Sequence, residues 1–208
     1  DPDDRRVMLS RRAMMLVHEL GRPDEGIAAL LAVARAEGRD HMETWSALEA
    51  LVTDHPNLPV AIEAVEAQIR LADDEGIQSE LASRLVARVD QDDATAAQRI
   101  HALEVLHRVD PGDLAVVQRL AEMCEAEGRW ADAVKYLDEL AETEGDDEEL
   151  SKLSQHIAEL AEARLGDAQK AWSTLLPLAS QGDIASLEGL QSLASRHAMH
   201  DALVPVLV

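Results

Sequence analysis

The stretch "EGRWADAVKYL", residues 127–137, places a glycine two residues before a tryptophan that begins an apolar stripe. Gly128 is a residue type that commonly ends a helix, because glycine adopts the left-handed backbone conformation without steric strain. The stripe that follows has the helical spacing i, i+3, i+4, i+7, i+10 and i+11, and it comprises Trp130, Ala133, Val134, Leu137, Leu140 and Ala141. The stretch therefore predicts one helix that ends near Gly128 and a second that starts directly after it.

The same punctuation recurs along the chain. One series of breakers, at intervals of 34 to 38 residues, runs Pro2, Gly38, Gly76, Pro111, Gly145 and Gly182. A second series falls about midway between them and runs Gly21, Pro56, Asp92, Gly128, Gly166 and roughly His197. A period near 36 residues with a break at each half is typical of stacked helical hairpins.

The pattern predicts about twelve helices in six hairpins, near residues 3–20 and 24–37, 41–54 and 58–72, 77–89 and 93–109, 112–127 and 130–143, 147–164 and 167–180, and 183–196 and 199–208. The third repeat fits worst, because its apolar positions are one residue out of step. A small residue stands at the fourth place of each second helix, at Gly26, Ala61, Ala96, Ala133, Ala171 and Ala202. We expect these small residues to let the two helices of a hairpin approach closely.

Three of these joints, "GRWADAVKYLDEL", "GRPDEGIAALLAV" and "GDAQKAWSTLLPL", resemble the junction between the two helices of a tetratricopeptide repeat (TPR). The segments "DPGD" and "DPDD" are similar to the Asp-Pro joints between such repeats. The resemblance implies an all-α fold, a right-handed α-solenoid in a single domain over residues 1–208. Its expected TPR-like repeats are approximately 1–38, 39–75, 76–110, 111–145, 146–182 and 183–208. A HEAT-like or mixed solenoid stays open, because the period varies and Glu159 and Glu162 stand where that motif has small or aromatic residues.

Composition and charge exclude several classes of function. The 208 residues are 47% hydrophobic and carry a net charge of −22, of which −21 falls on residues 41–208. Nucleic acid is excluded as a partner because a duplex binder needs a basic surface, and anionic membrane surfaces are disfavoured for the same reason. The sequence contains no run of 18 apolar residues, so we expect no membrane insertion. Neither end of the sequence looks like a natural terminus, so we expect the chain to be a fragment of a longer bacterial repeat protein.

Searching for catalytic or cofactor motifs yields none. There is no HExxH, CxxC, GxSxG or phosphate-binding glycine loop, so we expect no enzyme activity, no cofactor and no metal. The single cysteine, Cys124, excludes an internal disulfide, which favours the cytoplasm while the periplasm stays open. Cys124 lies on an apolar stripe, where a buried small hydrophobe is expected rather than a nucleophile. Trp45, Trp130 and Trp172 are interpreted as core anchors.

The resemblance implies a scaffold that binds a partner protein or peptide on the concave face formed by the first helices. Carried over by position, the contacting residues are Arg11 and His18, Ser46 and Thr53, and Gln118, Glu122 and Glu125. The alternative for each is an ordinary solvated helix position. Two other functions stay open: a structural spacer without a dedicated ligand, and a regulatory segment of an enzyme encoded outside these residues.

The N-terminal helix is the basic exception in this acidic chain. It carries Arg5, Arg6, Arg11 and Arg12. One interpretation is a basic patch that docks acidic residues of a preceding repeat or of a second copy, giving self-association with the acidic remainder. The other interpretation is an exposed helix face with no partner.

Overall fold

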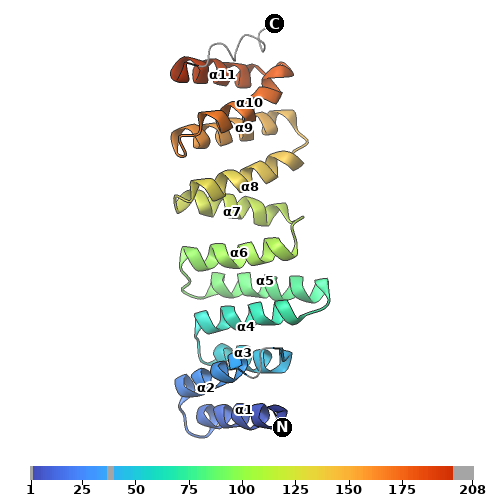
Figure 1. Cartoon of the computed structure of the whole chain (residues 1–208), viewed down its shortest axis with the longest axis vertical. Helices are drawn as coiled ribbons and strands as arrows, with labels where there is room; N and C mark the ends of the chain where they lie inside the picture. Colours follow the sequence, from blue (N-terminus) through green and yellow to red (C-terminus); the bar gives the residue numbers. More distant parts are fainter. Residues whose placement is uncertain (1, 37–39, 199–208) are drawn as a thin grey trace. The chain divides into compact units, whose positions relative to one another are not determined.

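A computed structural model describes residues 2–36 and 40–198, and within these ranges it contains eleven α-helices and no strand (Figure 1). The helices are α1 (Pro2–His18), α2 (Pro23–Ala36), α3 (Met42–Asp54), α4 (Leu58–Leu71), α5 (Glu75–Gln91), α6 (Ala96–Val109), α7 (Leu114–Ala126), α8 (Trp130–Thr143), α9 (Asp147–Ala163), α10 (Ala168–Ser180) and α11 (Ile184–His197). Consecutive helices pair as hairpins, beginning with α1 and α2 and ending with α9 and α10, and α11 packs on α10. The predicted all-α solenoid of helical repeats is confirmed.

The chain forms two compact units, residues 1–112 and residues 113–208. In the first unit, helices α1 to α6 form three hairpins, and their fully buried side chains include Leu30, Leu48, Leu85 and Ile100. In the second unit, α7 to α10 form two hairpins followed by α11, with Leu120, Ile157 and Leu190 fully buried. Both cores are mainly aliphatic, as expected from a sequence without phenylalanine. The six repeat boundaries inferred from the sequence period stay a prediction.

Aspartates begin many of the helices, and they explain the acidic residues that surround the breakers. An N-cap carboxylate accepts hydrogen bonds from backbone N–H groups that have no partner within the helix. Asp113 Oδ1 accepts from Ala115 at 3.0 Å, and Asp146 Oδ1 accepts from Glu148 and Glu149 at 3.0 Å. The same role belongs to Asp74, Asp167 and Asp183.

Glycines with positive φ end four of the helices. Gly128 has φ +71°, and Gly21, Gly166 and Gly182 are also in this region. After Gly128 the backbone N–H of Arg129 donates to the carbonyl of Cys124 at 2.8 Å, which is the bond of a Schellman C-cap. The helix break predicted at Gly128 and the restart at Trp130 are both confirmed.

The start of the sixth helix was predicted wrongly. The sequence pattern placed it near residue 93, whereas α6 begins at Ala96. Thr95 is its N-cap and forms a capping box with Gln98, so the polar residues before Ala96 belong to the turn. Ala96 is therefore the first residue of the helix rather than the small residue at its fourth place. The predicted helix at 199–208, with Ala202, lies outside the described residues.

Small residues bring the hairpin helices together in the other repeats. Ala61, Ala133 and Ala171 are at most 1% exposed. The tightest approach is at Gly26, where an added Cβ would lie 2.3 Å from Val17 Cγ2 and 2.8 Å from the Ala13 carbonyl oxygen. Only glycine fits this contact between α1 and α2.

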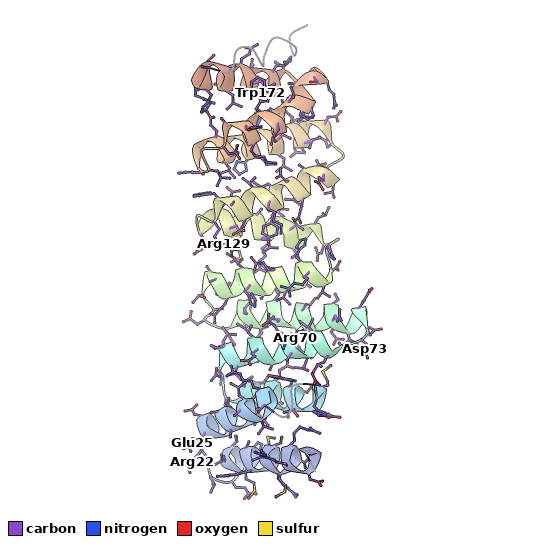
Figure 2. The ribbon with its side chains drawn as sticks, viewed as in Figure 1. Arg22, Glu25, Arg70, Asp73, Arg129 and Trp172 are labelled. Carbon is purple, nitrogen blue, oxygen red and sulfur yellow. The ribbon has the colours of Figure 1, made fainter. Side chains whose placement is uncertain are left out.

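The tryptophans differ in burial. Trp45 is 2% exposed, and Trp172, in α10 (Figure 2), is 8% exposed, so both are core anchors as predicted. Trp130 is only half buried, so its interpretation as a core anchor is wrong. Cys124 is fully buried, as its place on an apolar stripe predicted.

Candidate partner-binding face

Two of the hollows that border α9 in the second unit lie between it and another first helix. One, of about 470 Å³, lies between α7 and α9, and Glu125, Trp130 and His156 line it. The other, of about 500 Å³, lies between α9 and α11, and Glu162, Glu188 and Arg196 line it. Glu159 lines both hollows, so α9 forms a ridge between them. We call this surface of α7, α9 and α11, with its two hollows, the first-helix face.

Polar side-chain contacts join the neighbouring first helices at this face. His156 Nε2 of α9 lies 2.9 Å from Glu125 Oε1 of α7. Across the other hollow, Glu162 of α9 accepts from Arg196 at 2.6 Å, and its second oxygen lies 2.8 Å from His197 Nε2. Each of these contacts joins side chains from successive hairpins.

Two further acidic residues lie on the face, and one exposed arginine, Arg164, lines the first hollow. Glu159 and Glu188 are exposed and border the hollows. Residues 113–208 contain 19 acidic and 7 basic residues, so the unit as a whole is strongly negative. A surface of this charge attracts cationic groups and disfavours phosphates.

The half-buried indole of Trp130 is part of the first hollow. The guanidinium of Arg164 lies 4.8 Å from its ring centroid, an arrangement in which the cation is attracted to the π face. The lining of this hollow therefore includes an aromatic ring, the Arg164 cation beside it and the carboxylate of Glu125.

The structure brings the three predicted residues of α7 together. Gln118 and Glu122 are exposed, and the Gln118 amide donates to Glu122 Oε1 at 3.0 Å. Glu125 follows one turn later and lines the first hollow. The three side chains thus lie along one stripe of α7.

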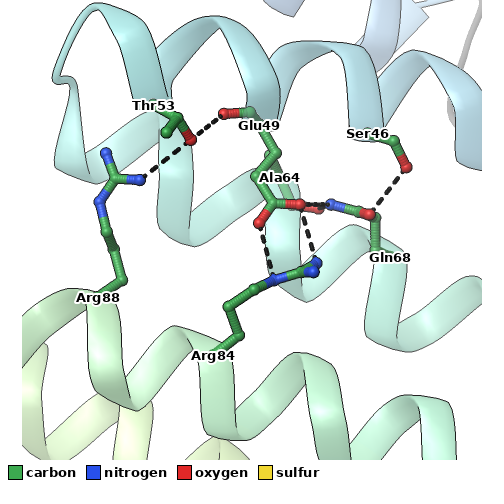
Figure 3. A network of polar contacts seen from close by, with 7 residues as sticks. All are labelled: Ser46, Glu49, Thr53, Ala64, Gln68, Arg84 and Arg88. Atoms are coloured by element: carbon green, nitrogen blue, oxygen red, sulfur yellow. Dashed lines mark hydrogen bonds and ion pairs between the residues drawn. The ribbon is translucent and has the colours of Figure 1, made fainter.

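The predicted residues of α3 lie in a polar network that joins α3, α4 and α5 (Figure 3). The Ser46 hydroxyl donates to Gln68 Oε1 at 2.8 Å, and the Gln68 amide donates to Glu49 at 2.7 Å. Arg84 of α5 reaches the same Glu49 carboxylate at 3.1 Å. Gln68 is only 4% exposed. Its buried side-chain amide in α4 therefore finds the hydrogen-bond partners that it needs in Ser46 and Glu49 of α3.

Thr53 accepts a hydrogen bond from Arg88 of α5 at 3.3 Å, which places it in the same inter-helix contact region. Ser46 and Thr53 therefore have structural partners within the first unit. Arg11 and His18, also in the first unit, are exposed and lie seven residues apart on α1. A role in binding for these four residues stays a prediction.

Sequence reasoning did not select Glu159, Glu162 or Glu188 as site residues. The first two carried a signal, because charged residues stood where the resemblance leads to small or aromatic ones. Glu188 carried none, since it is one exposed acid among many. The hollows themselves have no signal in the sequence, because side chains from three separate helices line each of them.

One carboxylate at the edge of this unit has a shifted pKa. Hydrogen bonds from Ser186 and Ser151 hold the pKa of Asp183 below its ordinary value of 3.8. Ser151 Oγ donates to Asp183 Oδ2 at 3.0 Å and the Ser186 backbone N–H donates at 2.7 Å, so the ionised carboxylate ties α9 to the start of α11.

Two features are absent from residues 2–36 and 40–198. These residues contain no group of three or more His, Cys, Asp or Glu side chains placed to hold a metal ion. None of their helices combines the length and the apolar composition that crossing a membrane requires.

Comparison with known proteins identifies the repeat. Residues 88–157 match the family model described as Tetratricopeptide repeat. That segment contains all of α6, α7 and α8 together with parts of α5 and α9. No curated protein matches the chain.

Several solved structures are similar to it. With "Structure of Naa15/Naa10 bound to HypK-THB" the identity is 20% and the TM-score 0.44, covering 95% of this chain but only 30% of the matched chain. With "Crystal structure of MamA" the values are 18% and 0.36, covering 85% and 94%. With a thermophilic TPR protein of Thermus thermophilus they are 17% and 0.33, covering 91% and 97%. On the family match and its array of helical hairpins, the chain is a TPR-like helical repeat protein.

Proposed function

We propose that the chain is a non-enzymatic scaffold that binds a partner protein or peptide on the first-helix face of its second unit. The observation that carries the proposal is the pair of hollows on either side of α9, of about 470 and 500 Å³, with Glu159 on the ridge between them. Tetratricopeptide repeats generally mediate protein–protein interaction, and repeat arrays use such surfaces for extended ligands.

The charge of the face favours a basic partner segment. A peptide that crosses α9 would place one side chain in each hollow and pass over the exposed carboxylates of Glu159 and Glu188. Lysine or arginine side chains would meet Glu159 and Glu188, and a partner side chain that packs on Trp130 would replace Arg164 beside its ring. Attraction between opposite charges accelerates association and weakens as salt is added.

Gln118, Glu122 and Glu125 would form the α7 border of the same face. Arg11, His18, Ser46 and Thr53 are proposed as contacts of the first unit, with the reservation for Ser46 and Thr53 that any ligand would compete with their internal hydrogen bonds. The spacer and the regulatory segment are the alternatives, and they differ from the scaffold because neither requires residues 1–208 to bind a ligand.

The test selects peptides from a random displayed library on the immobilised chain. The expected winners are rich in lysine and arginine, and their binding should fall at least tenfold in the double variant Glu159→Lys and Glu188→Lys. A second variant, the triple substitution Gln118→Lys, Glu122→Lys and Glu125→Lys, should also weaken binding. All variants should keep the helical circular dichroism of the wild type, because the altered side chains lie at the surface.

The matched control is the double variant Glu142→Lys and Glu80→Lys, which makes the same change in net charge at two exposed residues outside the two hollows. It should bind the selected peptides as the wild type does. An equal loss in the control would show attraction to the net charge alone and reject the proposed face. Selection that yields no enriched sequence would favour the spacer.

A further inference from the structure

The outer face of α1 exposes methionines and arginines together. Met8 is 70% exposed and Met15 is 46% exposed, although both are large apolar side chains. They lie seven residues apart and therefore on the same side of the helix. Arg11 lies between them and Arg12 follows it, and both are exposed. We call Met8, Arg11 and Met15 the α1 outer face.

At the equivalent positions of other first helices, the side chains are mostly covered. Met8, Arg11 and Met15 lie ten, seven and three residues before the end of α1 at His18. The same positions before the ends of α5 and α9 are occupied by Leu81, Arg84 and Arg88 and by Leu153, His156 and Leu160. All six are buried or half buried except Arg84, whose guanidinium is held in an ion pair. The corresponding residues of α3 and α11 are also buried or half buried.

In both helices these positions contact the preceding hairpin. Arg84 of α5 pairs with Glu49 of α3 at 3.1 Å, and Arg88 donates to the Val52 carbonyl at 2.8 Å. His156 of α9 lies 2.9 Å from Glu125 of α7. In α5 and α9 the residue seven positions before the end is thus a basic residue that meets a carboxylate from the preceding first helix, whereas α3 has Ala47 and α11 has Leu190 at this position. Arg11 stands at this same position.

We propose that the α1 outer face is a docking surface for an acidic amphipathic helix of a partner protein, which stacks on α1 as a preceding hairpin stacks on α5 and α9. The apolar stripe of that helix would cover Met8 and Met15, and a carboxylate would meet Arg11. Methionine suits such a contact because its flexible side chain adapts to irregular surfaces.

Charge distinguishes this partner from a second copy of the chain. Two α1 helices in symmetric contact would bring Arg11 and Arg12 of one copy against the same residues of the other. A second copy could instead stack its α11 on α1. One residue before its end, α11 has Arg196, whereas α7 and α9 have Glu125 and Glu162 at that position, so α11 would bring an arginine toward Arg11. Both arrangements place like charges together, whereas an acidic helix does not. The surface shares no residue with the first-helix face. Arg11 is also one of the contacts proposed above for the first unit, whereas Met8 and Met15 are not, so Met8→Asp tests this proposal separately from the proposed function.

The test uses the whole chain and a defined probe. The probe is a fluorescent synthetic peptide with the sequence of residues 113–145, carrying Cys124→Ala, because this acidic hairpin covers the corresponding positions of α9. Fluorescence anisotropy should show saturable binding to the wild type, and binding should weaken at least tenfold with Met8→Asp or Arg11→Glu. Hydrogen exchange of the α1 backbone should slow when the probe is bound to the wild type and not when it is added to either variant.

Two variants serve as matched controls. Ile184→Asp changes a residue that is 71% exposed, close to the 70% of Met8, and Arg70→Glu reverses an exposed arginine of α4 (Figure 2). Both should bind the probe as the wild type does. No binding to the wild type, binding of a scrambled peptide with equal affinity, or equal losses in the controls would each overturn the proposal. Sedimentation that shows wild-type dimers and Met8→Asp monomers would assign the face to a second copy and overturn the partner assignment.

Discussion

Replacing Gly26 with alanine should destabilise the α1–α2 hairpin by about 1–2 kcal/mol, although alanine is the better helix former. The added Cβ would lie 2.3 Å from Val17 Cγ2 and 2.8 Å from the Ala13 carbonyl oxygen. Ordinary contacts between carbon atoms are about 3.5–4.0 Å, so the two helices would have to separate. Rotation of Val17 can relieve the first contact, whereas the second is with the backbone.

The magnitude follows from two opposing effects. Alanine gains about 1 kcal/mol over glycine inside a helix. Overpacking a close contact costs about 1–3 kcal/mol, and the backbone contact with Ala13 places this site toward the upper end. The difference is a net loss of about 1–2 kcal/mol.

Urea denaturation of residues 1–208, with hydrogen exchange of the α1 amides, measures this loss. Exchange in α1 should accelerate more than elsewhere, because the strain is confined to the first hairpin. The control is Gly112→Ala, where the added Cβ meets only Asp110 Oδ1 at an ordinary 3.7 Å, and it should be close to neutral. Adding Val17→Ala to Gly26→Ala should relieve the side-chain clash but not the backbone one. A Gly26→Ala protein as stable as the wild type would refute the close approach of α1 and α2.

Gly128→Ala should lower the free energy of unfolding by about 1–2 kcal/mol in thermal or urea unfolding, because φ is +71° there. The control is Gly145→Ala, which should be close to neutral, because this glycine does not have a positive φ and no atom lies near its added Cβ. Since Ser186 and Ser151 lower the pKa of Asp183, its carboxylate contributes stability above the ordinary pKa of 3.8 that is lost as pH falls through the lower folded value. An acid-unfolding titration should therefore show a smaller loss of α9–α11 stability below pH 3.8 in Asp183→Asn, and identical curves would contradict this.

Local chemistry explains which helices could be read from the sequence. Both ends of α8, Trp130 and Thr143, were predicted correctly. The signals at its start, Gly128 and the apolar stripe from Trp130, lie within a few residues of the turn. The start of α6 was missed, since the segment before it has no glycine or proline and its signal is the capping box of Thr95 and Gln98. The break at Asp92 was itself predicted correctly, because Asp92 is the C-cap of α5.

The candidate face could be read only in part. Position in the repeat placed Gln118, Glu122 and Glu125 on one stripe of α7, because helical periodicity alone decides which residues share a side. It also placed Ser46 and Thr53 on one side of α3, but could not show that Gln68 and Arg88 bond to them. Trp130 was misread because its apolar stripe says nothing about how much of the ring the neighbouring hairpin covers.

The sequence by itself determined the α-helical class, the hairpins and most helix bounds, because caps, glycines and apolar stripes act between residues at most a few turns apart. Only the tertiary structure decided that Glu125 meets His156, that Glu162 meets Arg196, and that Met8 and Met15 stay exposed. Those partners are 31 and 34 residues apart, in successive hairpins. Their meeting depends on how each hairpin rotates as it packs on the one before it, which no local pattern specifies.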